Sequence, residues 1–582
     1  MCQRKNPPWC QKMAVLSIKD VQKGGRNACK LFRLCMRRKQ AMQLRAIYIK
    51  RRNTMKKTWL FSSFIFVLAL ALFLGGCSSS PISEEKATKD TLVFGRGGDS
   101  TSLDPITTTE GETFKVTENM FEKLLNYGEK DTTIHPGLAT EWDVAKDGKS
   151  YTFYLREGVK FHDGTDFNAE AVKFNFDRWM NGDAEKFPYY GMFGGYKKDK
   201  GHVIKDIIVK GEHEIEFQLK RPQATFLKNI AMSPFGIASP AAVEKSGDSF
   251  RENPVGTGPF KFKEWKQNDR IVLEKNEDYW QKDKPKLKQI IFRSIPENSA
   301  RLNALKTGEI DLMDGVNPSD LDGIKTDKAL QLIERPSMNV GYIGLTVTRK
   351  PLDNKLVRQA LNYAVDKESI IESFYGGLAE PAKNPLPPSL EGYNDEIEPY
   401  PYDPEKAKEL LKEAGFPDGF RIKLWAMPVP RPYMPDGMKV AEVIQSNFEK
   451  VGVKAEIVTY DWATYLDKAS KGEADVFLLG WTGDNGDPDN FIYTLLDKDS
   501  IGGNNYTFFQ NDKMHDILIE AQTDTDQKKR NELYQEAQEI IHDEAPWIPL
   551  VHSIPMLAAS KDLKGYQPHP TGSEALTDVY FE

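Results

Sequence analysis

The feature that most constrains the fold is a regular alternation of helix and strand patterns between residues 403 and 480. The first helix has Asp403 as its N-cap, Pro404 at its first helical position and Gly415 as its end. Apolar strand patterns then follow at 420–427, 453–460 and 474–480, separated by helical patterns at 437–452 and 461–472. Because strands that alternate with helices build parallel sheets, the sequence predicts an α/β fold.

Two polar loops follow strands of this unit. "PVPRPYMP" comes after the strand that ends near residue 427, and "WTGDNGDP" comes after the strand that ends at residue 480. Ligands of open α/β sheets bind beside the carboxyl ends of the strands, so we expect both loops to project toward the same edge. The candidate binding residues in and beside these loops are Trp425, Arg431, Tyr433, Trp481, Gly483 and Asp484.

The charges of these loops suit a ligand that carries both signs. A buried carboxylate needs a cationic partner, and a buried guanidinium needs an anionic one. A free peptide supplies both, so Asp484 could bind its ammonium group and Arg431 could hold its carboxylate with two hydrogen bonds. The aromatic residues of the loops could exclude water. Core packing of each aromatic residue, and a solvated loop position for each charge, are the alternatives.

Other motifs point away from catalysis. Asp143 stands where a phosphate-binding loop ending in Lys149 and Ser150 requires glycine. "FHDG", with His162, is interpreted as a turn. "DNGDPDN" lacks the residue spacing of a calcium loop, and no metal site or cofactor is predicted. Asp484 and Asp487 could instead be a pair of catalytic carboxylates, so a secreted hydrolase stays open as an alternative function.

The front half of the body is rich in strand patterns. Alternating apolar residues predict two half-buried strands, with Tyr151, Phe153 and Leu155 facing inward on one and Ile215, Phe217 and Leu219 on the other. A last helix over 529–544 is predicted to have a core stripe made of Leu533, Ala537, Ile540 and Ile541.

The N-terminal 91 residues have the layout of an exported, lipid-modified chain. Residues 1–54 hold fifteen Lys or Arg residues and one acid, and we interpret them as a basic extension upstream of the true start at Met55. Residues 55–76 join a basic pair to an apolar core of about fifteen residues, shorter than the roughly 20 that span a bilayer. The ending "LGGC" is similar to the bacterial lipobox, which makes Cys77 the predicted lipidation site. Residues 77–91 then form a tether.

Charge and cysteine content limit the partners of the body. Removing the 17 Lys and Arg residues and the single acid of residues 1–76 leaves 62 basic and 84 acidic residues, a net charge near −22. Such a surface repels phosphate backbones, so no nucleic-acid partner is expected. After Cys77 there is no cysteine for a disulfide, a nucleophile or a metal.

Four stretches resemble the markers of the family 5 extracellular solute-binding proteins, the receptors of ABC importers: "GKSYTFYLREGVKFHDGTDF", "NPVGTGPFKFKEW", "VRQALNYAVDKESII" and "YDPEKAKELLKEAGF". The resemblance covers essentially all of residues 92–582. It implies a two-lobe periplasmic-binding-protein-like fold with a hinge and an additional subdomain in the front lobe. Lobe I is expected at 92–337 plus 555–582, and lobe II at 338–554.

The resemblance also implies a function. "LWAMPVPRPYMP" and "LGWTGDNGDPDNF" are similar to the family's dipeptide receptors, in which the aspartate binds the peptide's amino terminus and the arginine binds its carboxylate. Those residues are Asp484 and Arg431 here. We therefore expect a monomeric, non-enzymatic dipeptide receptor that is lipid-anchored outside the cytoplasm, on a Gram-positive surface rather than in a periplasm, and that serves ABC permease subunits. Receptors of this fold for oligopeptides, haem, glutathione or a nickel complex are the alternatives within the family.

Overall fold

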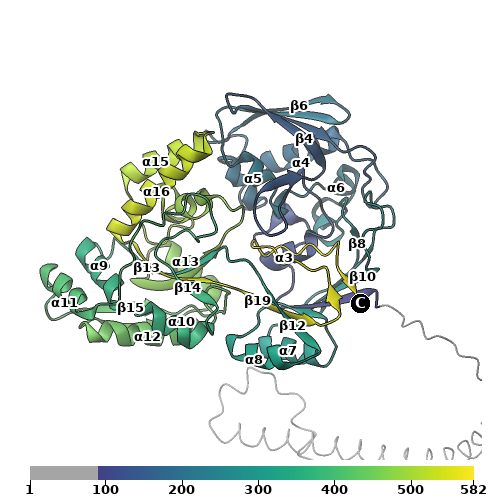
Figure 1. The fold of residues 1–582 in the computed structure, drawn as a ribbon. Coiled ribbons are helices and arrows are strands. Elements are labelled where there is room, and N and C mark those ends of the chain that lie inside the picture. Colours follow the sequence, from purple (N-terminus) through teal and green to yellow (C-terminus); the bar gives the residue numbers. More distant parts are fainter. Residues whose placement is uncertain (1–88) are drawn as a thin grey trace, which may run out of the picture. The chain divides into compact units, whose positions relative to one another are not determined.

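The computed structural model describes residues 89–582, so the basic extension, the signal sequence, Cys77 and most of the tether lie outside the described residues. Two large mixed sheets and a separate antiparallel sheet organise this part of the chain (Figure 1). Among residues 89–582, no helix is long and apolar enough to cross a bilayer.

The first large sheet has seven strands and collects segments from both ends of the described chain. The strand order is β12 (Leu330–Glu334), β19 (Met556–Ser560), β11 (Leu312–Met313), β1 (Thr91–Arg96), β10 (Gln289–Ser294), β9 (Arg270–Lys275) and β8 (Phe260–Lys266). Strands β1 and β10 pair in parallel, whereas β19, from the C-terminal region, pairs antiparallel with β11 and β12.

A four-stranded antiparallel sheet with its own buried core accompanies it. Its order is β4 (Ala139–Val144), β5 (Ser150–Leu155), β7 (Glu214–Leu219) and β6 (Ile204–Gly211). The inward-facing residues predicted for β5 and β7 are all buried, which confirms the alternation. Helices α4 (Ala169–Met180) and α5 (Phe226–Ile230) contribute to the same core. We call the part of the chain built on these two sheets the first lobe.

The second lobe is built on a six-stranded sheet, whose order is β14 (Ala379–Pro381), β18 (Trp547–Ser553), β13 (Asn339–Leu345), β17 (Val476–Thr482), β15 (Arg421–Trp425) and β16 (Lys454–Val458). Strand β15 pairs in parallel with both β16 and β17, so the predicted parallel unit is confirmed. The helices between these strands are α12 (Gly437–Lys450) and α13 (Trp462–Ser470).

The caps predicted for the helix before this unit are also present. Helix α11 spans Pro404–Glu413, the Asp403 side chain accepts a hydrogen bond from the backbone N–H of Lys406, and Gly415 has a φ of +90°. That backbone conformation favours glycine.

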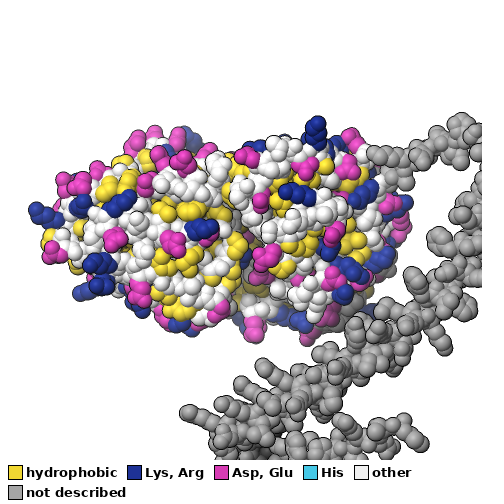
Figure 2. Space-filling model, turned by 90° about the horizontal axis from the view of Figure 1, so that it is seen from below, with side chains coloured by type: hydrophobic (Ala, Val, Ile, Leu, Met, Phe, Trp, Pro, Cys, Tyr) yellow, Lys and Arg dark blue, Asp and Glu magenta, His cyan; other side chains and the backbone are white. Residues whose placement is uncertain are grey.

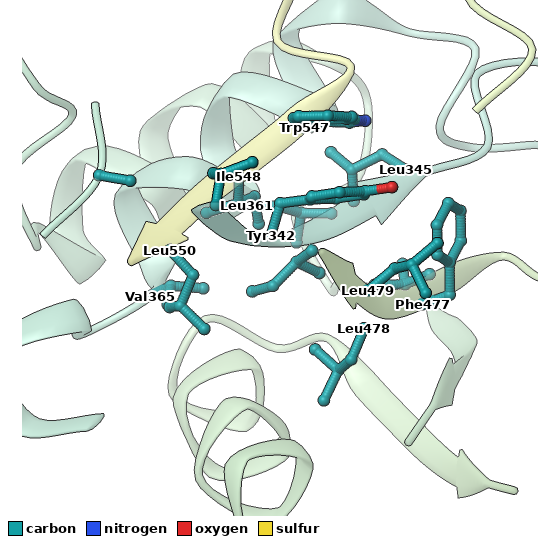
Figure 3. Packing of buried hydrophobic residues seen from close by; sticks show 14 of the residues in the cluster. Tyr342, Leu345, Leu361, Val365, Phe477, Leu478, Leu479, Trp547, Ile548 and Leu550 are labelled. Atoms are coloured by element: carbon teal, nitrogen blue, oxygen red, sulfur yellow. The ribbon is translucent and has the colours of Figure 1, made fainter. Parts of the chain in front are cut away.

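Aromatic stacking fixes the middle of the second lobe's sheet. The rings of Tyr342 on β13 and Trp547 on β18 stack with their centroids 3.6 Å apart and their planes 6° apart (Figure 3). Phe477 and Leu478 of β17 lie beside them in the same cluster. Strand β17, which leads directly into one of the two candidate loops, is therefore anchored in a dense core.

The final helix differs from its predicted stripe. Helix α16 spans Gln527–Glu544, and Ala537 and Ile541 are buried as predicted, but Leu533 and Ile540 are only half-buried. Arg530 and Tyr534 occupy the buried face instead. Leu533 and Ile540 still pack against the same core, so the stripe is present but incomplete: it left out an arginine in a core position, which requires a buried anion beside it.

Acidic and basic side chains lie side by side over the face of the described chain that Figure 2 shows, with hydrophobic side chains between them. The negative charge of the body is therefore not gathered into one patch on that face.

Candidate functional site

The two candidate loops lie next to each other at the carboxyl ends of β15 and β17. Tyr433, in the loop after β15, packs directly on Gly480 of β17. A Cβ atom at Gly480 would stand 2.2 Å from the Tyr433 ring, so only glycine permits this approach. Tyr433 is 8% exposed, and its carbonyl oxygen accepts a hydrogen bond of 2.9 Å from the Tyr375 hydroxyl. The first loop is thus fixed against the strand that leads into the second.

Asp484 is a half-buried carboxylate with only neutral partners. Its Oδ1 accepts a hydrogen bond of 3.0 Å from the hydroxyl of Tyr189, and its Oδ2 accepts one of 3.0 Å from the side-chain amide of Asn490. Within residues 89–582, no Lys or Arg side chain forms an ion pair with it. Burial raises the pKa of Asp484, and its two hydrogen bonds oppose that rise only in part.

Asn490 organises the loop around this carboxylate. Its Oδ1 accepts hydrogen bonds from the Trp481 indole N–H (3.0 Å) and from the backbone N–H of Asp484 (2.9 Å). Gly483, between the two, donates its N–H to the carbonyl oxygen of Met338, and a Cβ there would stand 2.7 Å from the Phe491 ring. The geometry of this loop therefore depends on contacts between residues 481–484 and residues 490–491.

Arg431 lies on the neighbouring loop, in a tight turn closed by two backbone hydrogen bonds with Met434 (3.0 and 2.9 Å). The residue is exposed, and its guanidinium lies over the Trp462 ring, 5.3 Å from the centroid. Burial raises the pKa of Tyr433 to about 12, and the charge and hydrogen bonding of Arg431 oppose that rise. The guanidinium is therefore close to both aromatic side chains.

Trp425 has the surroundings of a core residue. It is 2% exposed, and its ring packs against Tyr460 and Tyr465, with centroid separations of 4.8 and 5.6 Å. Its indole N–H has no hydrogen-bond partner among the described residues. A direct contact of Trp425 with a ligand stays a prediction.

Asp487 behaves differently from Asp484, although it lies only three residues later. Both oxygens of this carboxylate accept hydrogen bonds from Nη2 of Arg530, at 2.9 and 3.0 Å, and the two side chains are 1% and 3% exposed. Arg530 and, from the first lobe, Lys228 lower the pKa of Asp487 against the effect of burial. Because its charge is already compensated, Asp487 is a structural carboxylate.

The other motifs have local structural explanations. His162 contacts the carbonyl oxygen of Gly258 at 3.0 Å, and burial lowers the pKa of its imidazole to about 4. Asp163 accepts from the backbone N–H of Thr165, which is the predicted turn. In the described part of the chain, Asp497, Asp499 and His515 are close enough to share a metal ion, but Nδ1 of His515 already lies at hydrogen-bond distance, 3.1 Å, from both carboxylate oxygens of Asp497.

The second candidate loop touches the first lobe at several points. Besides the Tyr189 hydrogen bond to Asp484, the amide of Asn485 donates to the side chain of Asn229 (2.9 Å), and Lys228 Nζ donates to the carbonyl oxygen of Gly486 (2.8 Å). These contacts place a first-lobe surface directly on the loop that carries Asp484.

Tyr189, Asn490 and Arg530 were missed by sequence reasoning. Tyr189 is separated from Asp484 by 295 residues, and Arg530 from Asp487 by 43. Only Asn490 had a local signal, because it lies within the polar stretch itself.

Comparison with known proteins identifies the class. Residues 133–503 match the family described as bacterial extracellular solute-binding proteins, family 5, middle region. The chain belongs to this family of extracytoplasmic solute-binding proteins, and its fold is the two-lobe fold of periplasmic binding proteins.

Three relatives show how close the similarity is. The chain is 41% identical to the dipeptide-binding protein of Escherichia coli strain K12, over 84% of this chain and 95% of that protein. It is 38% identical to heme-binding protein A of Haemophilus influenzae, over 86% and 94%. The crystal structure of a dipeptide-binding protein from Pseudoalteromonas sp. SM9913 in complex with Met-Leu has a TM-score of 0.76 and 31% identity, over 84% of this chain and all of that chain.

Proposed function

We propose that this protein is a receptor that captures dipeptides outside the cytoplasm and delivers them to the permease of an ABC importer, without chemistry of its own. The observation that carries the proposal is the state of Asp484. Its carboxylate is partly removed from water but has only neutral hydrogen-bond donors within residues 89–582. The ammonium group of a peptide supplies the missing positive charge.

Arg431 holds the other end of the peptide in this proposal. Its guanidinium lies on the loop next to the one that carries Asp484, and its planar set of donors matches a carboxylate. Trp481, Tyr433, Trp425 and Gly483 complete the wall around the peptide. The relatives that are named for dipeptide binding support this assignment.

The lobes close on the peptide by bending at the two segments that connect the large sheets, residues 335–338 and 554–555. The side chain of Asn339 exchanges hydrogen bonds with the backbone of Ser553 next to these segments (2.9 and 3.1 Å), so both bend together. Lobe I is then 92–337 plus 555–582, and lobe II is 338–554. Closure brings Tyr189 onto Asp484 and removes water from the ion pairs, which strengthens them.

The membrane attachment completes the proposal. Cys77 carries the lipid, residues 77–91 tether a monomeric body to the outer face of a Gram-positive membrane, and the closed lobes dock on the permease subunits. Mass spectrometry of the mature N-terminus tests the anchor: a lipid-modified Cys77 is expected, and a chain that retains residues 55–76 would contradict it.

Calorimetric titration of the protein, purified without unfolding, tests the ligand. We expect Ala-Ala to bind, and acetyl-Ala-Ala, Ala-Ala-amide and a pentapeptide to bind at least about 100-fold more weakly, because each removes or misplaces one charge. Native mass spectrometry of the same sample identifies any co-purified ligand. If Ala-Ala fails to bind while haem, glutathione or a metal complex is found, the dipeptide assignment is wrong and the receptor class remains.

A further inference from the structure

Arg431 presents a physical difficulty for its proposed role. The residue is exposed, and an exposed arginine side chain samples many rotamers, so fixing it on a ligand costs conformational entropy. The backbone turn with Met434 fixes the Cα atom, and the guanidinium has a long hydrogen bond of 3.5 Å to the carbonyl oxygen of Pro430 and a hydrogen bond with the Tyr433 side chain. A support on the face of the guanidinium adds to these contacts and makes the group ready for a carboxylate.

The support comes from the first turn of α13. Trp462 is the first residue of this helix and is half-buried, and the Arg431 guanidinium lies 5.3 Å from the centroid of its ring. This geometry is that of a cation–π contact. Such a contact leaves the edges of the guanidinium free, because its donors lie in the plane of the group.

The Trp462 ring is itself held in place. It stacks on Tyr465, with the centroids 5.8 Å apart and the planes 22° apart. Tyr465 is fully buried, and its hydroxyl donates to the carbonyl oxygens of Leu478 on β17 (2.7 Å) and Trp425 on β15 (3.2 Å). A column of contacts thus runs from the middle of β17 and the end of β15 through Tyr465 and Trp462 to the guanidinium.

We infer that Trp462 is a positioning residue for the ligand carboxylate: its ring holds the Arg431 guanidinium flat, so that two N–H groups are presented in one plane to a carboxylate. The inference rests on the proposed function of Arg431 and adds a residue outside both candidate loops. It also assigns Tyr465 a part in the site as the base of the column.

A double-mutant cycle with Ala-Ala as the ligand tests this inference by calorimetry. Trp462→Leu is expected to lower affinity about three- to tenfold in the wild-type background and to have no further effect in the Arg431→Leu background, since the two side chains act as one unit. Trp462→Phe keeps an aromatic face and should retain most of the affinity.

A matched control is available on the same lobe. Lys450 lies 5.4 Å from the ring centroid of Tyr402, which is an exposed cation–π contact of the same kind. Tyr402→Leu should leave the affinity for Ala-Ala unchanged. Thermal unfolding of each variant separates loss of fold from loss of binding.

Two results would overturn the inference. In the first, Trp462→Leu lowers affinity equally in both backgrounds, or has no effect while Arg431→Leu weakens binding. Trp462 then does not act through Arg431, but the proposed binding of the peptide by Asp484 and Arg431 still stands. If Arg431→Leu itself leaves the affinity unchanged, the carboxylate role of Arg431 fails, and the role of Trp462 fails with it.

Discussion

Asp484 and Asp487 belong to the same polar stretch, residues 481–491, and have opposite electrostatic surroundings. Asp487 is buried against Arg530, which lowers its pKa, whereas Asp484 is half-buried against neutral donors, and burial raises its pKa. The Asp487 carboxylate stabilises the fold, and the Asp484 carboxylate has a charge without a cationic partner. The comparison shows that partners from distant segments, rather than residue type or loop sequence, decide which acid has a cationic partner and which has only neutral ones.

Breaking the structural pair has the largest expected effect. Arg530→Met leaves Asp487 buried and without its main partner, so we expect the free energy of unfolding to fall by about 3–5 kcal/mol. Urea unfolding measures this change. Arg421→Met, at an exposed position of β15, is the control and should cost much less. A loss below about 1 kcal/mol for Arg530→Met would mean that the pair does not stabilise the fold.

Removing the open carboxylate acts on binding instead. Asp484→Ala leaves the peptide's ammonium group buried and unpaired, and we expect Ala-Ala binding to weaken by about 3–5 kcal/mol. Asp467→Ala, which removes an exposed carboxylate of α13, should leave binding unchanged. Calorimetry compares the two variants, and equal affinities would place the ammonium elsewhere.

Asp489, a third acid of the same stretch, is expected to make the stability of the fold depend on pH. Burial and the neighbouring charge of Asp487 raise the pKa of Asp489 to about 7. A pKa that is higher in the folded than in the unfolded state means that stability is lost as the pH rises from about 4 to 7. Asp489→Asn should therefore gain about 1–3 kcal/mol at pH 8 and little at pH 4. Urea unfolding at the two pH values measures the difference, and an equal gain at both would contradict the assignment.

The contact of Lys228 with the loop is a weaker link between the lobes. Its Nζ donates to Gly486 and lies 4.0 Å from an Asp487 oxygen that Arg530 already compensates. Lys228→Met should therefore weaken Ala-Ala binding by only about 1 kcal/mol, by loss of the closed arrangement. A loss as large as that of Asp484→Ala would show instead that Lys228 takes part in the site.

The smallest expected effect has the opposite sign. Asp484→Asn removes a carboxylate whose pKa burial raises, so the protein without peptide should become more stable at neutral pH, by about 1–3 °C in Tm. Asp487→Asn should lower Tm under the same conditions. Differential scanning calorimetry compares them, and a shift of the same sign for both would remove the distinction between the two acids.

Local patterns were enough to predict the scaffold of the site. The alternation over 403–480 predicted the parallel pairing of β15 with β16 and β17, and Asp403 caps its helix as expected. Such features follow from neighbours in sequence. The partners that define the site come from distant parts of the sequence: Tyr189 approaches from the first lobe, and Arg530 comes from α16, where the predicted stripe of apolar residues did not include it. The pattern of apolar residues along the sequence does not predict these contacts, because they form only when the lobes and helices pack.

The pKa of Asp484, measured with and without Ala-Ala, tests the central claim most directly. Carbon-13 NMR of carboxyl-labelled aspartates follows the titration, and the spectrum of Asp484→Asn identifies the resonance. We predict a pKa above that of an ordinary aspartate in the free protein and a clear decrease when the ammonium group binds. An ordinary pKa that does not change on binding would contradict the account, because the carboxylate would then neither be desolvated nor pair with the ligand.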